Sequence, residues 1–181
     1  MNYHNITTDD MLNGSGLRVT LWVSGCSMNC RKCHNPQTHK FNSGIPFTEN
    51  DINELFDKLN KPYISGLTLS GGHPLEFNNL STVYNIVKRV KERFPDKSIW
   101  IYSGYTFEQI LEMENMYNGN TINPPSPLDV IKHCDILVDG KYIDELRDVT
   151  LAFRGSSNQR IIDIQKSLSE NRIVIWDNTN T

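Results

Sequence analysis

The chain lacks the features that mark several common classes of protein. Among its 181 residues no apolar run reaches the length that crosses a bilayer, which is about 20 residues. The polar start at Met1 shows no signal-peptide pattern. The net charge is −3 and the basic residues are scattered, so no patch for nucleic acid is evident. We therefore expect neither a membrane protein nor a direct nucleic-acid binder, and we expect a cytoplasmic location, where thiols stay reduced.

Cysteine is also scarce, but three of the four cysteines share one short loop. Cys26, Cys30 and Cys33 have the spacing Cys-x3-Cys-x2-Cys and directly follow the apolar run 17–23. Iron–sulfur clusters usually take four Cys ligands. Three thiolates with no fourth cysteine nearby therefore predict a cluster in which one iron is left open. Ligands from a single loop also converge at little cost in chain entropy.

The spacing leaves two other interpretations of these cysteines open. A structural zinc site takes four closed ligands, and His34 or His39 would complete the three thiols. Alternatively, the thiols are unrelated to one another. We do not expect a disulfide between them, because disulfides need an oxidising compartment. The fourth cysteine, Cys134, stands beside the apolar run 136–138 and fits a small buried apolar residue. We leave Cys134 out of the candidate site.

Strand-like apolar runs alternate with helix-like stretches along the chain. The predicted strands cover residues 17–23, 64–69, 98–102, 135–138 and 172–176. Alternation at about 30–40 residues per unit is typical of βαβ crossovers and a mostly parallel sheet. About four such units cannot close an eight-stranded barrel. We therefore expect an α/β fold, with a single domain over residues 1–181 and an open or partial β/α barrel.

Two of the predicted helices carry recognisable start signals. Thr48 and Asp51 resemble a capping box with Asp in place of Glu, and Thr106 and Gln109 form a second box. The first box is followed by apolar residues at helical spacing, namely Ile52, Leu55, Phe56 and Leu59. The stretch 117–127 is rich in Asn, Gly and Pro, which predicts a surface loop.

Small or polar residues follow each of the predicted parallel strands. The first strand leads into the cysteine loop, and the next three lead into residues 70–74, 103–105 and 139–141. Parallel sheets bind ligands at the carboxyl ends of their strands. We therefore expect these four segments to surround one site. Their glycines let backbone approach a ligand closely, although each glycine alone also fits an ordinary turn.

The cysteine triad and the segment Ser-Gly-Gly-His-Pro at 70–74 together resemble the radical S-adenosylmethionine (SAM) superfamily. Further segments narrow the resemblance to the activating proteins of anaerobic (class III) ribonucleoside-triphosphate reductase. These segments are residues 1–4, 13–18, 47–48, 103–105, 138–141 and 153–160. The last one, Phe-Arg-Gly-Ser-Ser-Asn-Gln-Arg, is far more specific to that family than the cysteines are. The resemblance spans nearly the whole chain.

The resemblance implies a concrete chemistry. Cys26, Cys30 and Cys33 would bind three irons of one 4Fe–4S cluster, and the amino and carboxylate groups of SAM would chelate the fourth. Reductive cleavage of SAM would give methionine and a 5′-deoxyadenosyl radical, which takes a hydrogen atom from a glycine of the reductase. The implied partners are that reductase and a low-potential electron donor such as flavodoxin. The cofactors carry the chemistry, so no catalytic side chain is expected beyond the cluster ligands.

Alternatives to this function remain within and outside the superfamily. One alternative within the superfamily is an activase like that of pyruvate formate-lyase, and another is a radical SAM enzyme with a small-molecule substrate. Outside the superfamily, it is a zinc-binding module without catalysis.

The resemblance also implies which residues contact SAM, namely Lys32, Cys33, His34, Gly71, Gly72 and His73. Lys32 and His34 flank the last thiolate and would reach the nucleotide through backbone groups. Many superfamily members have an aromatic residue at the place of Lys32, and the reductase-activase branch often has Gly. The backbone of Gly71 and Gly72 would accept hydrogen bonds from the SAM ammonium group.

Two positions depart from the family pattern or stay unassigned. The glycine motif usually continues with Glu or Asp, but this chain has His73, and a neutral His offers only one ring nitrogen as an acceptor. His73 is therefore a candidate contact rather than an assigned one. The segment from Arg154 to Arg160 contacts SAM, the reductase or its own fold, and the residues alone do not decide among these.

Overall fold

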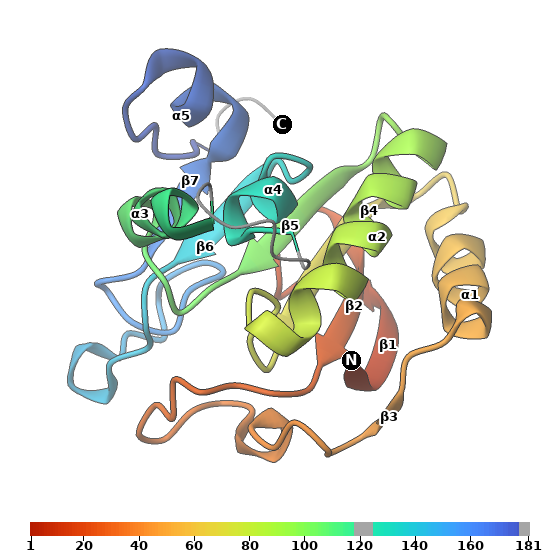
Figure 1. The fold of residues 1–181 in the computed structure, drawn as a ribbon, viewed down its shortest axis with the longest axis horizontal. Coiled ribbons are helices and arrows are strands. Elements are labelled where there is room, and N and C mark those ends of the chain that lie inside the picture. The colour runs from red at the N-terminus through yellow and green to blue at the C-terminus, as the bar shows by residue number, and fades with distance from the viewer. Residues whose placement is uncertain (118–124, 178–181) are drawn as a thin grey trace.

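The computed structural model describes residues 1–117 and 125–177 (Figure 1). Its centre is one seven-stranded sheet in the order β3-β1-β2-β4-β5-β6-β7. The strands are β1 (Asn2–Asp10), β2 (Leu17–Val23), β3 (Ile45–Pro46), β4 (Ile64–Gly71), β5 (Ser98–Tyr102), β6 (Ile136–Asp139) and β7 (Arg160–Asp163). The strands β2, β4, β5 and β6 run parallel, whereas β1, β3 and β7 join antiparallel at the two edges. The sheet is open, as predicted, and the fold is mixed α/β.

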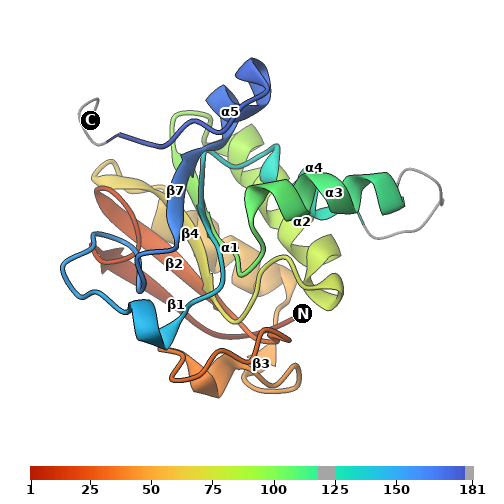
Figure 2. The same ribbon diagram turned by 90° about the vertical axis from the view of Figure 1, so that its left-hand side faces the viewer.

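The helices connect the parallel strands by crossovers. They are α1 (Glu49–Leu59), α2 (Phe77–Arg93), α3 (Phe107–Tyr117), α4 (Pro127–Ile131) and α5 (Ile164–Glu170). From β2 through β4 and β5 to β6, each parallel strand is added on the same side of the previous one. Since such crossovers are right-handed, the connecting helices fall on one face of the sheet. Figure 2 shows α2, α3 and α4 gathered on that face.

The two predicted capping boxes are confirmed. The backbone N–H of Thr48 donates to the Asp51 carboxylate at 2.6 Å, at the start of α1. The backbone N–H of Thr106 donates to Gln109 Oε1 at 2.9 Å, at the start of α3. The predicted apolar face of α1 is buried against the sheet. These local signals place the helices that cover the core.

The two faces of the sheet bury separate apolar clusters. The main core lies between the sheet and the helices and includes Ile99 and Ile101 of β5. A smaller cluster on the other face contains Trp100 with Ile136, Val138 and Ile161. Side chains alternate between faces along a strand, and a parallel strand covered on both faces is apolar throughout. This explains why β5 is a continuous apolar run.

Three features at the edges of the sheet differ from the sequence predictions. The predicted strand 172–176 is wrong, because only Ile175 there forms an isolated bridge, with Ile162. The edge strand is instead β7, which the sequence analysis missed, and α5 follows it directly. The strand β1 was also missed, since its polar Asn and Asp residues hide the strand pattern of a partly exposed edge.

Two further predictions concern the loop and the membrane. The predicted loop 117–127 falls mostly outside the residues that the structure describes. Within the described ranges, no helix combines the length and the apolar character needed to span a membrane.

Candidate functional site

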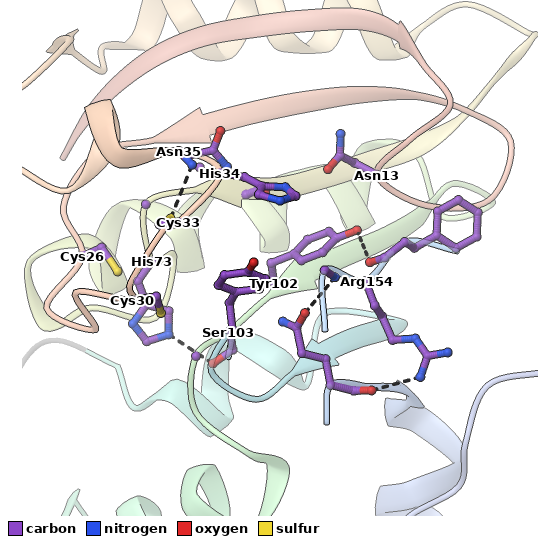
Figure 3. Close-up of a pocket in the computed structure, with 18 of the residues that line it drawn as sticks. Asn13, Cys26, Cys30, Cys33, His34, Asn35, His73, Tyr102, Ser103 and Arg154 are labelled. Atoms are coloured by element: carbon purple, nitrogen blue, oxygen red, sulfur yellow. Dashed lines mark hydrogen bonds between the residues drawn. The ribbon is translucent and has the colours of Figure 1, made fainter. Parts of the chain in front are cut away.

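A cavity of about 660 Å³ opens at the carboxyl ends of the parallel strands. Its wall contains residues from all four of the segments that were predicted to surround one site. They are Cys26, Cys30, Cys33, Ser70, Gly71, Gly72, His73, Ser103, Gly104 and Gly140. The predicted grouping is therefore confirmed, and Figure 3 shows the three cysteines at one end of the cavity. Parallel topology explains this, because it places the carboxyl ends of all four strands at one edge.

The cysteine loop turns sharply and brings its thiols to the cavity. Asn29 and Lys32 adopt positive φ angles of 48° and 52°, a region that residues other than Gly seldom occupy. The positive φ at Lys32 is a conformation that Gly adopts without strain. All three thiols are free and partly exposed. By contrast, Cys134 is fully buried in the core, as expected.

The surroundings of the thiols suit an iron–sulfur cluster. The backbone N–H of Asn35 donates to Cys33 Sγ at 3.4 Å. Burial raises the pKa of the Cys26 thiol, while hydrogen bonds from the backbone of Met28 and Asn29 oppose that rise. Such N–H donors stabilise sulfur that carries negative charge, which is how proteins tune clusters. The donor set and its hydrogen bonds therefore fit a cluster held by three cysteines.

The positions of the side chains disfavour the zinc interpretation. Among residues 1–117 and 125–177, no three His, Cys, Asp or Glu side chains lie close enough to hold a single metal ion. A zinc site needs its four ligands around one ion. A four-iron cluster makes no such demand, because each cysteine binds a different iron.

Glu76 anchors the cysteine loop, and the sequence analysis missed it. Its buried carboxylate accepts hydrogen bonds from the backbone N–H of Ser27 at 2.7 Å and from Ser27 Oγ at 2.5 Å. Burial alone would raise the pKa of Glu76, but hydrogen bonds from His73 and Ser27 outweigh it and lower the pKa to about 2. Glu76 is thus ionised and positions the residue next to Cys26. The available signal was an acidic residue three places after His73.

His73 is buried and engaged within the protein through both ring nitrogens. Its Nε2 lies 3.1 Å from Ser103 Oγ, and its Nδ1 lies 3.4 Å from the Glu76 carboxylate (Figure 3 shows the first contact). The ring also packs edge-on against Tyr105, with 4.6 Å between ring centroids. His73 therefore links the ends of β4 and β5 behind the cysteine loop.

Gly71 and Gly72 allow the end of β4 to approach the start of the cysteine loop. A Cβ at Gly72 would lie 2.7 Å from the Gly25 carbonyl oxygen, and one at Gly71 would lie 2.9 Å from that of Val23. Backbone at this distance leaves no room for any larger residue. The same absence of a Cβ exposes the backbone of both residues to the cavity.

The comparisons with known proteins agree with this geometry. The family model described as "4Fe-4S single cluster domain" matches residues 12–162, which is most of the chain. A protein of Enterobacteria phage T4 is 42% identical over 161 residues, covering 89% of this chain and 93% of its own length. It is named anaerobic ribonucleoside-triphosphate reductase-activating protein. The chain belongs to this family of activating proteins.

Two bacterial relatives carry the same name. The protein of Escherichia coli K12 is 37% identical and covers 88% of this chain and 96% of its own length. That of Vibrio cholerae is 39% identical and covers 89% of this chain and 97% of its own length. Since these relatives match over nearly their full lengths, the likeness extends well beyond the cysteine loop.

In this member of the family, the basic residues of the cysteine loop face an acidic segment. Lys32 Nζ lies 3.0 Å from Asp144 Oδ2, and Arg31 pairs with Glu145 at 3.2 Å. Lys32 is absent from the cavity wall, whereas His34 is part of it. Surface ion pairs contribute little individually. Both pairs lie where the 3-10 turn Asp144–Leu146 runs beside the cysteine loop.

The family-specific segment 153–160 is mostly occupied by contacts within the fold. Gln159 Oε1 accepts from the backbone N–H of Gly155 at 2.9 Å, and its Nε2 donates to the Gly140 carbonyl at 3.0 Å. Arg160 pairs with Asp139 and Glu108. Most of the segment therefore fastens the end of β6 to the start of β7. Arg154, which lines the cavity together with Phe153, Gly155 and Gln159, differs because its Nε has no hydrogen-bond partner among the described residues.

Proposed function

We propose that this protein is an iron–sulfur enzyme that reductively cleaves SAM and generates a glycyl radical on anaerobic ribonucleoside-triphosphate reductase. The observation that carries the proposal is the convergence of three free cysteines on one cavity at the carboxyl ends of a parallel sheet. Residues 1–181 then form one radical SAM domain, and the open sheet is its partial β/α barrel. The name shared by the relatives supports the choice of reductase.

Cys26, Cys30 and Cys33 hold a 4Fe–4S cluster in this proposal. When bound, that cluster supplies the electron for SAM cleavage and an open iron that binds SAM directly. The protein supplies position and exclusion of side reactions. Glu76 holds the loop through Ser27, and the ion pair of Lys32 with Asp144 holds its other side.

The contacts with SAM follow from the rest of the cavity wall. The backbone oxygens of Gly71 and Gly72 accept hydrogen bonds from the SAM ammonium group. Cys33 and His34 border the nucleotide, and Lys32 contributes backbone contacts alone, because its ammonium group is paired with Asp144. His73 is part of this wall and is held in place by Ser103 and Glu76.

A polypeptide substrate suits this architecture better than a small molecule. An open sheet leaves one side of the cavity accessible, so a loop of a second protein can enter while SAM is bound. The electron donor is a low-potential protein such as flavodoxin, and the reaction takes place in the cytoplasm. In this proposal the open sheet is what gives a loop of the reductase access to the cavity.

The decisive experiment combines metal analysis with radical transfer. Anaerobically reconstituted protein is expected to contain about four irons per chain, to cleave SAM with a reductant, and to yield a glycyl radical signal in electron paramagnetic resonance with the reductase. Cys26→Ala, Cys30→Ala and Cys33→Ala should each lose the cluster and SAM cleavage. Cys134→Ala is the matched control, since this cysteine is buried in the core, and it should keep both.

Several outcomes would contradict the proposal. One zinc and no iron would favour a binding module. A full cluster in all three loop variants would show that the ligands are wrong. SAM cleavage without radical transfer to the reductase would point to another radical SAM reaction.

A further inference from the structure

Arg154 is set apart from the other polar residues of segment 153–160. Gln159 and Arg160 complete their hydrogen bonds with the backbone and side chains of neighbouring segments. Arg154 makes one hydrogen bond of this kind, from Nη1 to the Gln159 carbonyl at 3.0 Å. Its Nε is buried and finds no hydrogen-bond partner among the residues that the structure describes. An unsatisfied buried donor is unfavourable, so the guanidinium group of Arg154 still has unused hydrogen-bonding capacity.

The backbone holds Arg154 in place at some cost. Phe153 adopts a positive φ of 59°, a backbone conformation that is unfavourable for a non-Gly residue. Tyr102 Oη donates to the Phe153 carbonyl at 2.9 Å, and the Phe153 ring packs on Trp100 with 5.3 Å between centroids. These contacts stabilise the strained turn, which therefore presents Arg154 in one fixed position.

The guanidinium group lies away from the cluster ligands. Figure 3 shows the Arg154 side chain on the opposite side of the view from Cys26 and Cys30, while lining the same cavity. Met11 and Leu12 belong to that cavity wall as well, although they are 67% and 81% exposed. Large apolar side chains this exposed at the edge of a cavity are typical of a surface that binds a partner.

The carboxylates near Arg154 leave its guanidinium group available for a ligand. Hydrogen bonds from Thr150, and to a smaller extent the charge of Arg154, lower the pKa of the Asp148 carboxyl. No ion pair joins Arg154 to Asp148 or to another carboxylate within the described part of the chain. The cavity thus has a cysteine end and an arginine end, and its wall also includes the exposed apolar side chains of Met11 and Leu12.

We propose that Arg154 is the recognition residue for the polypeptide substrate. Its guanidinium group binds an oxygen acceptor, a backbone carbonyl or a carboxylate, on the reductase segment that carries the reacting glycine. Met11 and Leu12 contact apolar side chains of the same segment. This inference rests on the proposed function, in which the SAM carboxylate is engaged at the cysteine end, so that the acceptor at the arginine end comes from the polypeptide.

The test separates binding of the reductase from chemistry on SAM. We compare the parent protein with Arg154→Ala and Arg154→Gln, each loaded with its cluster, and use Arg147→Ala as the matched control. Arg147 is exposed and lies outside the cavity wall. We expect both Arg154 variants to raise the Kd for the reductase at least tenfold and to lower the glycyl radical yield. Iron content, the Kd for SAM and SAM cleavage without reductase should stay within twofold of the parent.

The outcomes distinguish the two proposals from each other. A raised Kd for SAM, or unchanged affinity for the reductase, would overturn the role of Arg154 while leaving the proposed function intact. If Arg154→Ala loses its cluster or fails to fold, Arg154→Gln decides, because its amide can still donate to the Gln159 carbonyl. A parent protein that binds the reductase but produces no glycyl radical would overturn the proposed function itself.

Discussion

Two arginines, one at each end of the sheet, differ in how far their hydrogen bonds are satisfied. Arg18, near the amino end of β2, is fully buried and donates to Thr68, Ser98 and the carbonyls of Ser15, Leu67 and Ser98 at 2.7–3.0 Å. Its guanidinium group also lies 5.5 Å from the Trp100 ring centroid. Arg154, at the cavity, has a single such bond and a buried Nε without a partner among the described residues. Arg18, whose hydrogen bonds are complete, stabilises the fold, whereas Arg154 keeps a donor that a ligand can use.

The charge of Arg18 also depends on the hydrogen bonds that the buried side chain makes. Burial lowers the pKa of Arg18 to about 10, partly opposed by the charge of Asp135. Arg18 therefore remains charged at neutral pH and depends on neutral oxygens for its stabilisation. A buried charge is tolerated only when its hydrogen bonds are complete. The amino end of the sheet should accordingly control stability, and the carboxyl end should control function.

The largest effect on this comparison is expected from Arg18→Ala. The substitution removes the cation and leaves its buried acceptors, including Thr68 Oγ1 and the Leu67 carbonyl, without their donor. We expect the free energy of unfolding to fall by about 3–5 kcal/mol, as measured by urea denaturation. Among molecules that fold, SAM cleavage per cluster should match the parent.

Arg172→Ala is the control for this variant. Its side chain is 67% exposed, and such surface changes usually alter stability by less than about 0.5 kcal/mol. A loss of SAM cleavage in folded Arg18→Ala protein, with little change in stability, would contradict the division between the two ends.

A smaller effect, and one that depends on pH, is expected from Glu76→Gln. The pKa of Glu76 falls from its ordinary 4.5 to about 2 in the folded protein. A carboxyl group whose pKa is lowered on folding stabilises the protein above its unfolded pKa and loses that contribution as the pH falls toward the folded pKa. Glu76→Gln should therefore cost about 2–3 kcal/mol at pH 7.

The measurement is urea denaturation of cluster-free protein over a range of pH. The difference between parent and variant should be constant above about pH 5.5 and should shrink as the pH falls through 4.5 toward 2. Glu108→Gln, whose carboxylate pairs with Arg160 away from the cysteine loop, is the control for cluster loading. Only the Glu76 variant should retain less iron, and equal iron in both would argue against positioning by Glu76.

The smallest effect is expected from His73→Glu. His73 lies 3.4 Å from the Glu76 carboxylate, so a second carboxylate at this position would be repelled. We expect the Kd for SAM to rise between two- and tenfold, as measured by anaerobic equilibrium binding. The double variant with Glu76→Gln should remove the repulsion and recover affinity.

The opposite result would be equally informative. A tenfold gain in SAM affinity, about 1.4 kcal/mol, would show that a carboxylate is the better ligand. His73 would then be a weak substitute, and its contacts with Ser103 and Glu76 would be incidental.

The sequence predicted those parts of the fold that depend on local patterns. The mostly apolar runs of β2, β4, β5 and β6 and the boxes at Thr48 and Thr106 are signals contained within a few positions of the chain. The strands at the edges of the sheet were harder to predict from the sequence. The strand β1 is partly exposed and polar, and the run at 172–176 forms only an isolated bridge, while its Trp176 packs against Trp100.

The candidate site also has features that the sequence predicted and features that it did not. The cysteine spacing and the small residues after each strand were enough to predict one site, since parallel topology brings strand ends together. Glu76, the pairing of Lys32 with Asp144 and the free Nε of Arg154 could not be predicted. Each depends on which side chains meet across segments distant in the chain.

The sequence by itself thus predicted the grouping of the three cysteines, the parallel order of the strands and the family, because these depend on spacings and runs along the chain. Tertiary structure alone decided which polar groups are saturated and which are left open. A hydrogen bond is completed or missed in three dimensions, and no spacing records whether Arg18 finds all its acceptors or Arg154 lacks one.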